Sequence, residues 1–150
     1  MLSVSAEHIR LFLHVLGACV WLGGQFVLAG LVPVVRAGGD PSVLRAVARR
    51  FQQLAWPAYA LLLATGAWNL AAIHVGDQSS AWLGSLVAKV VLVALSGICA
   101  ALHSFVIGPS VATAPDAASA KRRRAASGIS AALALACALA AAFLGVQLAG

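Results

Sequence analysis

The stretch LFLHVLGACVWLGGQFVLAGLVPVV, residues Leu11 to Val35, decides the fold of this chain. It is longer than the roughly 20 apolar residues that a helix needs to cross a bilayer, and it is too long for the apolar core of a signal peptide. The basic leader of a signal peptide is missing as well, because no Lys or Arg precedes His8. We therefore expect this stretch to remain in the protein as a first membrane span.

Three further apolar runs follow, and the chain as a whole is 62% hydrophobic and 9% charged. This composition lies far outside the balance of soluble globular domains. We predict an all-α integral membrane protein in which residues 1–150 form a single domain, a bundle of four transmembrane helices in the lipid bilayer. The predicted spans cover approximately residues 9–35, 54–75, 82–107 and 128–149.

The basic residues of the chain lie mainly between the apolar runs. Arg36, Arg45, Arg49 and Arg50 separate the first two spans, and the run from Lys121 to Arg124 separates the last two. By the positive-inside rule both connections face the cytoplasm, so both termini lie on the periplasmic side of a bacterial inner membrane. The net charge of +6 is then explained by topology, and no nucleic-acid partner is expected.

The two cytoplasmic connections differ in character. Asp40 followed by Pro41 is a capping residue with a first-turn proline, which predicts a short amphipathic helix through Leu44 and Phe51. Pro109 to Ser127 is rich in Ala, Ser and Pro and predicts a flexible surface loop. The last span is nearly all alanine and leucine, so we expect it to serve as a packing wall for the other helices.

Polar side chains within apolar runs are costly in a bilayer, so each is a functional hypothesis. His14, Asn69 and Lys89 each lie six residues inside the predicted outer end of a span, roughly 9 Å deep at the helical rise per residue. We predict that these three side chains meet in a pocket in the outer half of the bundle. Glu7 and His74 are expected near its mouth.

Helical spacing groups the residues of the first span. His14, Gly17, Trp21, Gly24 and Gln25 follow three- and four-residue steps, and therefore form one stripe. The stripe combines an imidazole, an indole and small residues, so a flat ligand could lie against it.

On the third span, Lys89, Ser96 and His103 are seven residues apart and share one helical face. His103 lies about 20 Å deeper than Lys89 by the same rise, so it is not expected to share a metal with His14. Structural alternatives stay open for each residue: Lys89 could extend to the outer interface, and His14 could be a packed histidine bonded to a carbonyl. The cysteines at 19, 99 and 137 are interpreted as small buried hydrophobic residues.

Three motifs carry a resemblance to a known superfamily. They are His14-x6-Trp21-x-Gly23-Gly24, Arg49-Arg50-x6-Pro57-x8-Gly66-x-Trp68 and Trp82-Leu83-x5-Lys89. In order and spacing they resemble a bacterial membrane superfamily that includes the copper-resistance D (CopD) domain and the HemJ-type protoporphyrinogen oxidases. The resemblance covers about the first two thirds of the chain, and the last span contributes little to it.

The two branches of this superfamily imply different functions. Resemblance to HemJ-like proteins implies haem b in the bundle, held by a histidine and a lysine at positions that match His14 and Lys89. Resemblance to CopD-like proteins implies copper movement across the inner membrane beside a periplasmic copper-binding partner. The segment Leu13 to Gln25 is most similar to the CopD-like branch.

Ligand chemistry favours haem b as the leading hypothesis. Copper(I) prefers thiolate and thioether ligands, but the only methionine is Met1 and the cysteines are scattered. A neutral histidine is a good axial ligand for haem iron. We expect a haem b protein that acts either in electron transfer or, as an oxidoreductase, in the oxidation of a quinone- or porphyrin-like substrate. Lys89 and Asn69 would take part in catalysis, and the cofactor would be bound by His14, Lys89, Trp21, Gly17, Gly24 and His74.

Two alternatives remain. In a copper permease, Glu7, His14 and His74 would receive the ion from the periplasm, while His103 and Gln25 would mark the inner exit. In a structural membrane subunit, the polar residues would only bond across helices. A homodimer, a redox partner or a periplasmic copper-binding protein is a possible assembly partner in each functional case.

Overall fold

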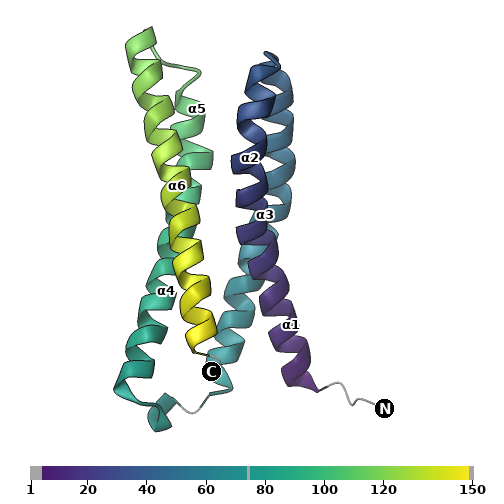
Figure 1. Ribbon diagram of the computed structural model, residues 1–150, viewed down its shortest axis with the longest axis vertical. Coiled ribbons are helices and arrows are strands. Elements are labelled where there is room, and N and C mark those ends of the chain that lie inside the picture. Colours follow the sequence, from purple (N-terminus) through teal and green to yellow (C-terminus); the bar gives the residue numbers. More distant parts are fainter. Residues whose placement is uncertain (1–4, 74, 149–150) are drawn as a thin grey trace. The chain divides into compact units, whose positions relative to one another are not determined.

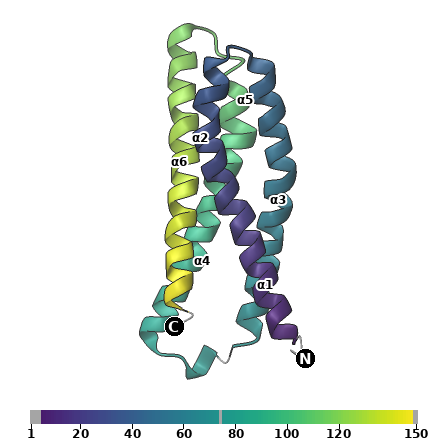
Figure 2. The ribbon, with the colours of Figure 1, turned by 45° about the vertical axis from the view of Figure 1, so that its right-hand side comes forward.

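The computed structural model describes residues 5–73 and 75–148, apart from the side chains at positions 41 and 75. The described part is helical, and it contains no β-strand. Contacts within the chain divide it into two compact units, residues Met1–Gln78 and Ser79–Gly150. Each unit is a hairpin of two long helical arms, and Figures 1 and 2 show the two arms of each hairpin side by side. The prediction of one four-span domain stays a prediction.

The first arm of the first unit is helical from end to end. It consists of α1 (Ala6–Ala18), a π-helical turn η1 (Cys19–Gly23) and α2 (Gly24–Ala37), which together make a rod of 32 residues, Ala6–Ala37. The second arm is α3 (Pro41–Ala71). A π-helical turn within an α-helix widens the backbone locally and is frequent at functional sites.

Polar residues at the helix ends define where these arms begin and turn. Ser5 and His8 form a capping box at the start of α1, in which the Ser5 side chain accepts from the His8 amide and the His8 ring accepts from the Ser5 amide. The chain then reverses at Gly39, whose φ of 82° lies in the left-handed region that favours glycine. Asp40 caps α3 by accepting from the amide of Ser42 over 2.7 Å.

The predicted start at Asp40 and Pro41 is confirmed, but the prediction of a separate short helix there is wrong. The helix continues without a break through Phe51 to Ala71, giving an α3 of 31 residues. The physical reason is that residues 42–56 contain no Gly or Pro, and that Pro57 is accommodated inside the helix. Residues 75–77 form a separate 3-10 turn, η2.

The second unit repeats the hairpin arrangement. Its first arm consists of α4 (Ser80–Ala101), a second π-helical turn η3 (Leu102–Ile107) and the short α5 (Gly108–Ser110). Its second arm is α6 (Ala117–Gln147). The small residues predicted to form a packing wall do so within this unit, since Ala134, Ala138 and Ala141 of α6 are buried and α4 is the helix packed along α6.

The predicted loop over Pro109–Ser127 is therefore wrong for most of its length. Only a short connection separates the arms, because Asp116 caps α6 by accepting from the amide of Ser119 over 2.7 Å. Alanine, lysine and arginine are good helix formers, so the basic run becomes part of the first turns of α6. Arg123 also donates to the carbonyl of Ser110 and ties the two arms together at this end.

Three helical stretches are long and apolar enough to cross a membrane: Ala6–Ala37, Ser80–Ser110 and Ala117–Gln147. The helix α3 does not meet the same composition limit among the described residues. Its first turns carry arginines, and its apolar half is interrupted by side chains that lower its hydropathy. These are Trp56, Pro57, Tyr59, Thr65, Trp68 and Asn69.

Candidate functional site

The two arms of the first unit approach most closely at Gly17. A Cβ added to Gly17 would lie 3.0 Å from the carbonyl oxygen of Ala58 and 3.2 Å from the amide nitrogen of Leu62. Backbone of α1 thus lies directly against backbone of α3, which is the use of glycine expected where membrane helices cross closely. Gly17 and Trp21 are both buried, so the stripe predicted from helical spacing is the face that packs on α3.

His14 lies one turn from this crossing and is held by Thr65 of α3. The Nδ1 atom of His14 is 3.0 Å from the Thr65 hydroxyl oxygen. That hydroxyl donates its single hydrogen to the carbonyl of Leu61 over 2.7 Å, so it accepts a hydrogen from Nδ1. The neutral imidazole then has its lone pair on Nε2, the form in which a histidine binds a metal while its other nitrogen is held in place.

On α3, Thr65 and Gly66 are the residues that lie at the level of His14. The imidazole packs against Gly66, where an added Cβ would be 3.4 Å from the ring atom Cε1. Asn69 lies in the last turn of α3 and not six residues inside it, because the helix ends at Ala71 and the predicted span ended at position 75. Thr65 and Gly66 therefore occupy the level at which the sequence placed Asn69.

One turn nearer the start of α1, two buried polar atoms have no hydrogen-bond partner among the described residues. They are the Nε atom of Arg10 and the Oδ1 atom of Asn69. Gly17 packs on Leu62 and His14 on Thr65, and the next step in this antiparallel register places Arg10 level with Asn69. Each of these atoms lies about one helical turn from the His14–Thr65 pair, Arg10 on α1 and Asn69 on α3.

One turn beyond Gly17, at η1, an aromatic cluster lies between the two arms. The Trp21 ring centroid lies 4.4 Å from that of Tyr59 and 5.6 Å from that of Trp56. Trp56 and Tyr59 pack edge to face with centroids 5.9 Å apart. Trp21 is only 4% exposed, so the indole, predicted as a cofactor contact, is covered by aromatic side chains of α3 in this unit.

The remaining predicted residues of the first unit are spread along the hairpin. Gln25 donates from its side-chain amide to the carbonyl of Trp21 over 3.0 Å, which satisfies backbone beside the π-helical turn. Gly24 faces the ring of Phe51, so its small size makes room for that side chain. Glu7 is exposed in the first turn of α1. His74 lies outside the described residues.

In the second unit, two serines connect α4 and α6. Ser96 donates to the carbonyl of Ala134 and Ser130 donates to the carbonyl of Cys99, both over 2.8 Å. Both serine side chains are buried. Lys89 and Ser96 of α4 and His103 of η3, predicted to share one helical face, all contact α6.

Lys89 lies against the opposite end of α6 from its basic run. A Cβ at Gly145 would be 3.0 Å from the lysine Nζ atom, so the ammonium group crosses the backbone of α6 where there is no side chain. The only acidic residue in positions 79–150 is Asp116, which caps the far end of α6. Lys89 therefore has no carboxylate partner within the described part of its own unit.

His103 is held in the same tautomer as His14. Its Nδ1 atom lies 2.9 Å from the carbonyl oxygen of Ser127 and 3.0 Å from the Ser127 hydroxyl. A carbonyl oxygen only accepts, so Nδ1 carries the hydrogen and Nε2 carries the lone pair. His103 also lies inside the π-helical turn η3, where its carbonyl would be only 2.6 Å from a Cβ at Gly108.

Neither unit assembles a closed metal site from its described residues. No group of three or more His, Cys, Asp or Glu side chains is close enough to hold a metal ion there. All three cysteines are free thiols, and Cys19 is exposed rather than buried as expected. His14 and Asn69 belong to the first unit and Lys89 to the second, so their meeting in one pocket stays a prediction.

Thr65 and Ser127 are the two histidine partners that the sequence analysis did not identify. Both are hydroxyl residues on the arm that packs against a histidine-bearing helix. Their signal was present in spacing, since Thr65 lies four residues before Asn69 and Ser127 lies three residues before Ser130. This spacing was not used, because Thr65 lies within an apolar run and Ser127 was assigned to a loop.

The length and composition of the helices define a multi-pass α-helical membrane protein, in which His14 of the first hairpin and His103 of the second each carry a hydrogen on Nδ1. Residues 45–146 match the family model of copper resistance protein D, CopD. The chain belongs to this family. The match includes α6, to which the sequence resemblance gave little weight, and it begins after the helix that carries His14. No curated protein and no solved structure matched the chain.

Proposed function

We propose that this protein carries copper across the bacterial inner membrane, with copper as its transported substrate. One observation carries the proposal. Both histidines inside apolar helices, His14 and His103, have Nδ1 tied to the second arm of their hairpin and the lone pair on Nε2. Metal-binding histidines use this arrangement, in which a second hydrogen bond fixes the ring and increases its basicity. Membership of the copper resistance family supports copper as the ion.

The proposal adds α3 as a membrane span to the three stretches identified above, which makes four spans. The 31 residues of α3 extend about 46 Å at the helical rise, so residues 54–71 cross part of the bilayer while the arginine-bearing first turns lie at its cytoplasmic surface. The basic first turns of α6 lie on the same side by the positive-inside rule. Both termini are then periplasmic, which puts His14 in the outer half of the membrane and His103 near its inner boundary.

Transport in this proposal uses separate donors at different depths. Copper enters from the periplasm past Glu7 and His74, binds at His14, and leaves past His103, with Gln25 near the exit. Conduction requires each site to bind strongly enough for entry and weakly enough for release. A single imidazole at each level satisfies that requirement better than a closed three-ligand cage. A periplasmic copper-binding protein is the proposed donor, and a homodimer would double the number of ligands.

The test is copper uptake by cells that express the protein at matched levels in the membrane. His14→Ala and His103→Ala should each lower uptake at least tenfold, since each removes the only imidazole proposed at its level. The matched control is His8→Gln, which also removes an imidazole but retains the Ser-x-x-Gln form of the capping box. Unchanged uptake in both alanine variants, or equal loss in His8→Gln, would contradict the proposal. If both alanine variants change only the stability of the protein, a purely structural subunit is favoured.

Binding of haem b is the second candidate function, and the buried Nε atom of Arg10, which has no hydrogen-bond partner among the described residues, favours it. A cation beside His14 repels a copper ion, whereas it would suit a haem propionate. His14 would supply the axial nitrogen, Arg10 and Lys89 would face propionates, and the bound haem would supply electron transfer to a quinone- or porphyrin-like substrate or a redox partner. Protein expressed with ample haem should then show a Soret band that His14→Ala abolishes and His8→Gln retains. A spectrum without this band, before and after reconstitution with haem, would exclude this candidate.

A further inference from the structure

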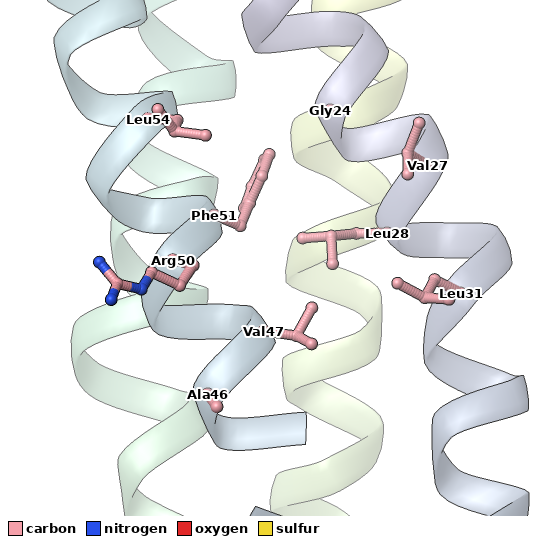
Figure 3. Close-up of a pocket in the computed structure, with 9 residues that line it drawn as sticks. All are labelled: Gly24, Val27, Leu28, Leu31, Ala46, Val47, Arg50, Phe51 and Leu54. Carbon is pink, nitrogen blue, oxygen red and sulfur yellow. The ribbon is translucent and has the colours of Figure 1, made fainter. Parts of the chain in front are cut away.

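An apolar groove of about 490 Å³ opens between α2 and α3 in the first unit. It is formed by α2 between Gly24 and Leu31 and by α3 between Ala46 and Leu54. Figure 3 shows Leu28 of α2 and Val47 and Phe51 of α3 directed into the space between the two helices. The arms are closely packed at Gly17, whereas α2 contributes no buried residue to the hairpin, so the groove begins where the close contact ends.

A polar hollow adjoins the apolar groove along α3. It has a volume of about 370 Å³ and is lined by Ala46, Arg49, Arg50 and Gln53. Arg50 belongs to both spaces: its stem borders the apolar groove, and its guanidinium extends away from α2 along the edge of α3 (Figure 3). The guanidinium donates to the side-chain carbonyl of Gln53 over 3.2 Å. The combined surface is therefore apolar on one side and cationic on the other.

The charge of the polar hollow is not balanced by the protein itself. Among the described residues, no ion pair involves Arg49 or Arg50. Asp40 is the nearest acidic residue along the chain, and it is already used as the cap of α3, where Arg45 is the arginine that acts on it. Two adjacent guanidinium groups beside an apolar groove complement an amphiphile with an anionic head.

We propose that this surface binds one molecule of an anionic phospholipid, with an acyl chain along the apolar groove and the phosphate at Arg50 and Arg49. Guanidinium groups bind phosphate oxygens through paired charge-assisted hydrogen bonds. Basic sites at the cytoplasmic boundary of membrane helices recognise anionic headgroups in this way. The phospholipid would join α2 to α3 where their side chains leave a gap, independently of the ion or cofactor at His14.

The test is native mass spectrometry of the full chain released from detergent, after addition of dioleoylphosphatidylglycerol or dioleoylphosphatidylcholine in equal amounts. The two lipids have the same acyl chains and differ in headgroup charge. We expect retention of one phosphatidylglycerol per chain at least tenfold above phosphatidylcholine, because each arginine near an anionic headgroup contributes roughly a fivefold preference. Arg49→Gln with Arg50→Gln should bring the ratio close to one.

Two matched controls make the result specific. Arg36→Gln with Arg45→Gln removes the same charge from residues outside the apolar groove and the polar hollow. This variant should retain the preference for phosphatidylglycerol. Val47→Phe fills the groove and should lower retention of both lipids, whereas Val34→Phe, at an exposed position outside the groove, should not. The proposal is overturned by equal retention of the two lipids, by equal effects of the two arginine pairs, or by a dimer that Val47→Phe dissociates.

Discussion

Ser96 and Ser130 form a reciprocal pair across the second hairpin, each donating to a backbone carbonyl of the opposite helix. The acceptor carbonyls of Ala134 and Cys99 lie within helices, so each serine adds a hydrogen bond between the arms. Ser96 is 1% exposed, which leaves no room for a larger side chain. The pair lies between the contacts that Lys89 of α4 and His103 of η3 make with α6.

Ser96→Ala should lower the free energy of unfolding by about 0.6 kcal/mol, the average for a hydrogen bond between membrane helices. The loss is modest because the Ala134 carbonyl is not left buried without a partner. Unfolding by SDS in mixed micelles, followed by circular dichroism, measures the change. Ser85→Ala is the control, since Ser85 donates only to Ala81 within α4. An equal loss in the two variants would show that the contact between helices adds nothing.

Thr65→Val should reduce copper uptake through His14, although it preserves the shape of the side chain. Without the hydroxyl, the Nδ1 hydrogen has no fixed acceptor and the imidazole can rotate or change tautomer. Loss of such a supporting hydrogen bond typically lowers metal affinity about 10- to 100-fold. Thr65→Ser retains the acceptor and should retain uptake. If Val and Ser variants behave alike, Thr65 does not position the histidine.

Gly17→Ala should destabilise the first hairpin by about 1–3 kcal/mol, the usual range for overpacking. The new methyl group would meet backbone atoms of Ala58 and Leu62, and these cannot move aside as a flexible side chain can. Gly30→Ala is the matched control, because a Cβ at Gly30 would have no atom within 4 Å. Thermal unfolding in detergent should therefore separate the two variants, and equal melting temperatures would contradict the close crossing.

Acidification should loosen the starts of α3 and α6. Hydrogen bonds from the Ser42 side chain and amide hold the pKa of Asp40 below its usual value, and those from the Ser119 amide and side chain lower the pKa of Asp116. Because both pKa values are depressed in the folded protein, the stabilisation is complete above the unfolded value of about 3.9 and is lost as pH falls through the folded values.

Circular dichroism between pH 6 and pH 2 checks this expectation. Replacement of both aspartates by asparagine retains helix caps and should remove the pH dependence at the helix starts. Replacement by alanine should lower helicity even at neutral pH. A double asparagine variant that loses helix content on acidification as the original protein does would show that other groups control the acid response.

Much of the helical architecture could be predicted, because the length and composition of the apolar runs indicate membrane-spanning helices. The helical face shared by Lys89, Ser96 and His103 followed from seven-residue spacing, and the packing role of α6 followed from its small residues. The continuous α3 could not be predicted in the same way. Its arginine-bearing turns and its apolar half differ in composition, but a helix depends on backbone propensity, which is high in both.

The candidate site stays largely a prediction. His14 was identified from the cost of a polar group in an apolar run, but the residue of α3 that lies at its level depends on where α3 ends. Because the helix ends at Ala71 and not at position 75, Thr65 lies at the level where Asn69 was expected. The π-helical turns have no simple sequence signature. The predicted joint pocket of His14 and Lys89 stays a prediction.

The division into two hairpins has a consequence for how the chain is made. The residues that join the two arms of the first hairpin, such as Gly17 and Thr65, are synthesised before the ribosome reaches α4. The first hairpin can therefore form its internal contacts, including the hydrogen bond between His14 and Thr65, while the second is still being translated. Each unit therefore contains the contacts that hold its own two arms together, and the boundary between the units lies between Gln78 and Ser79.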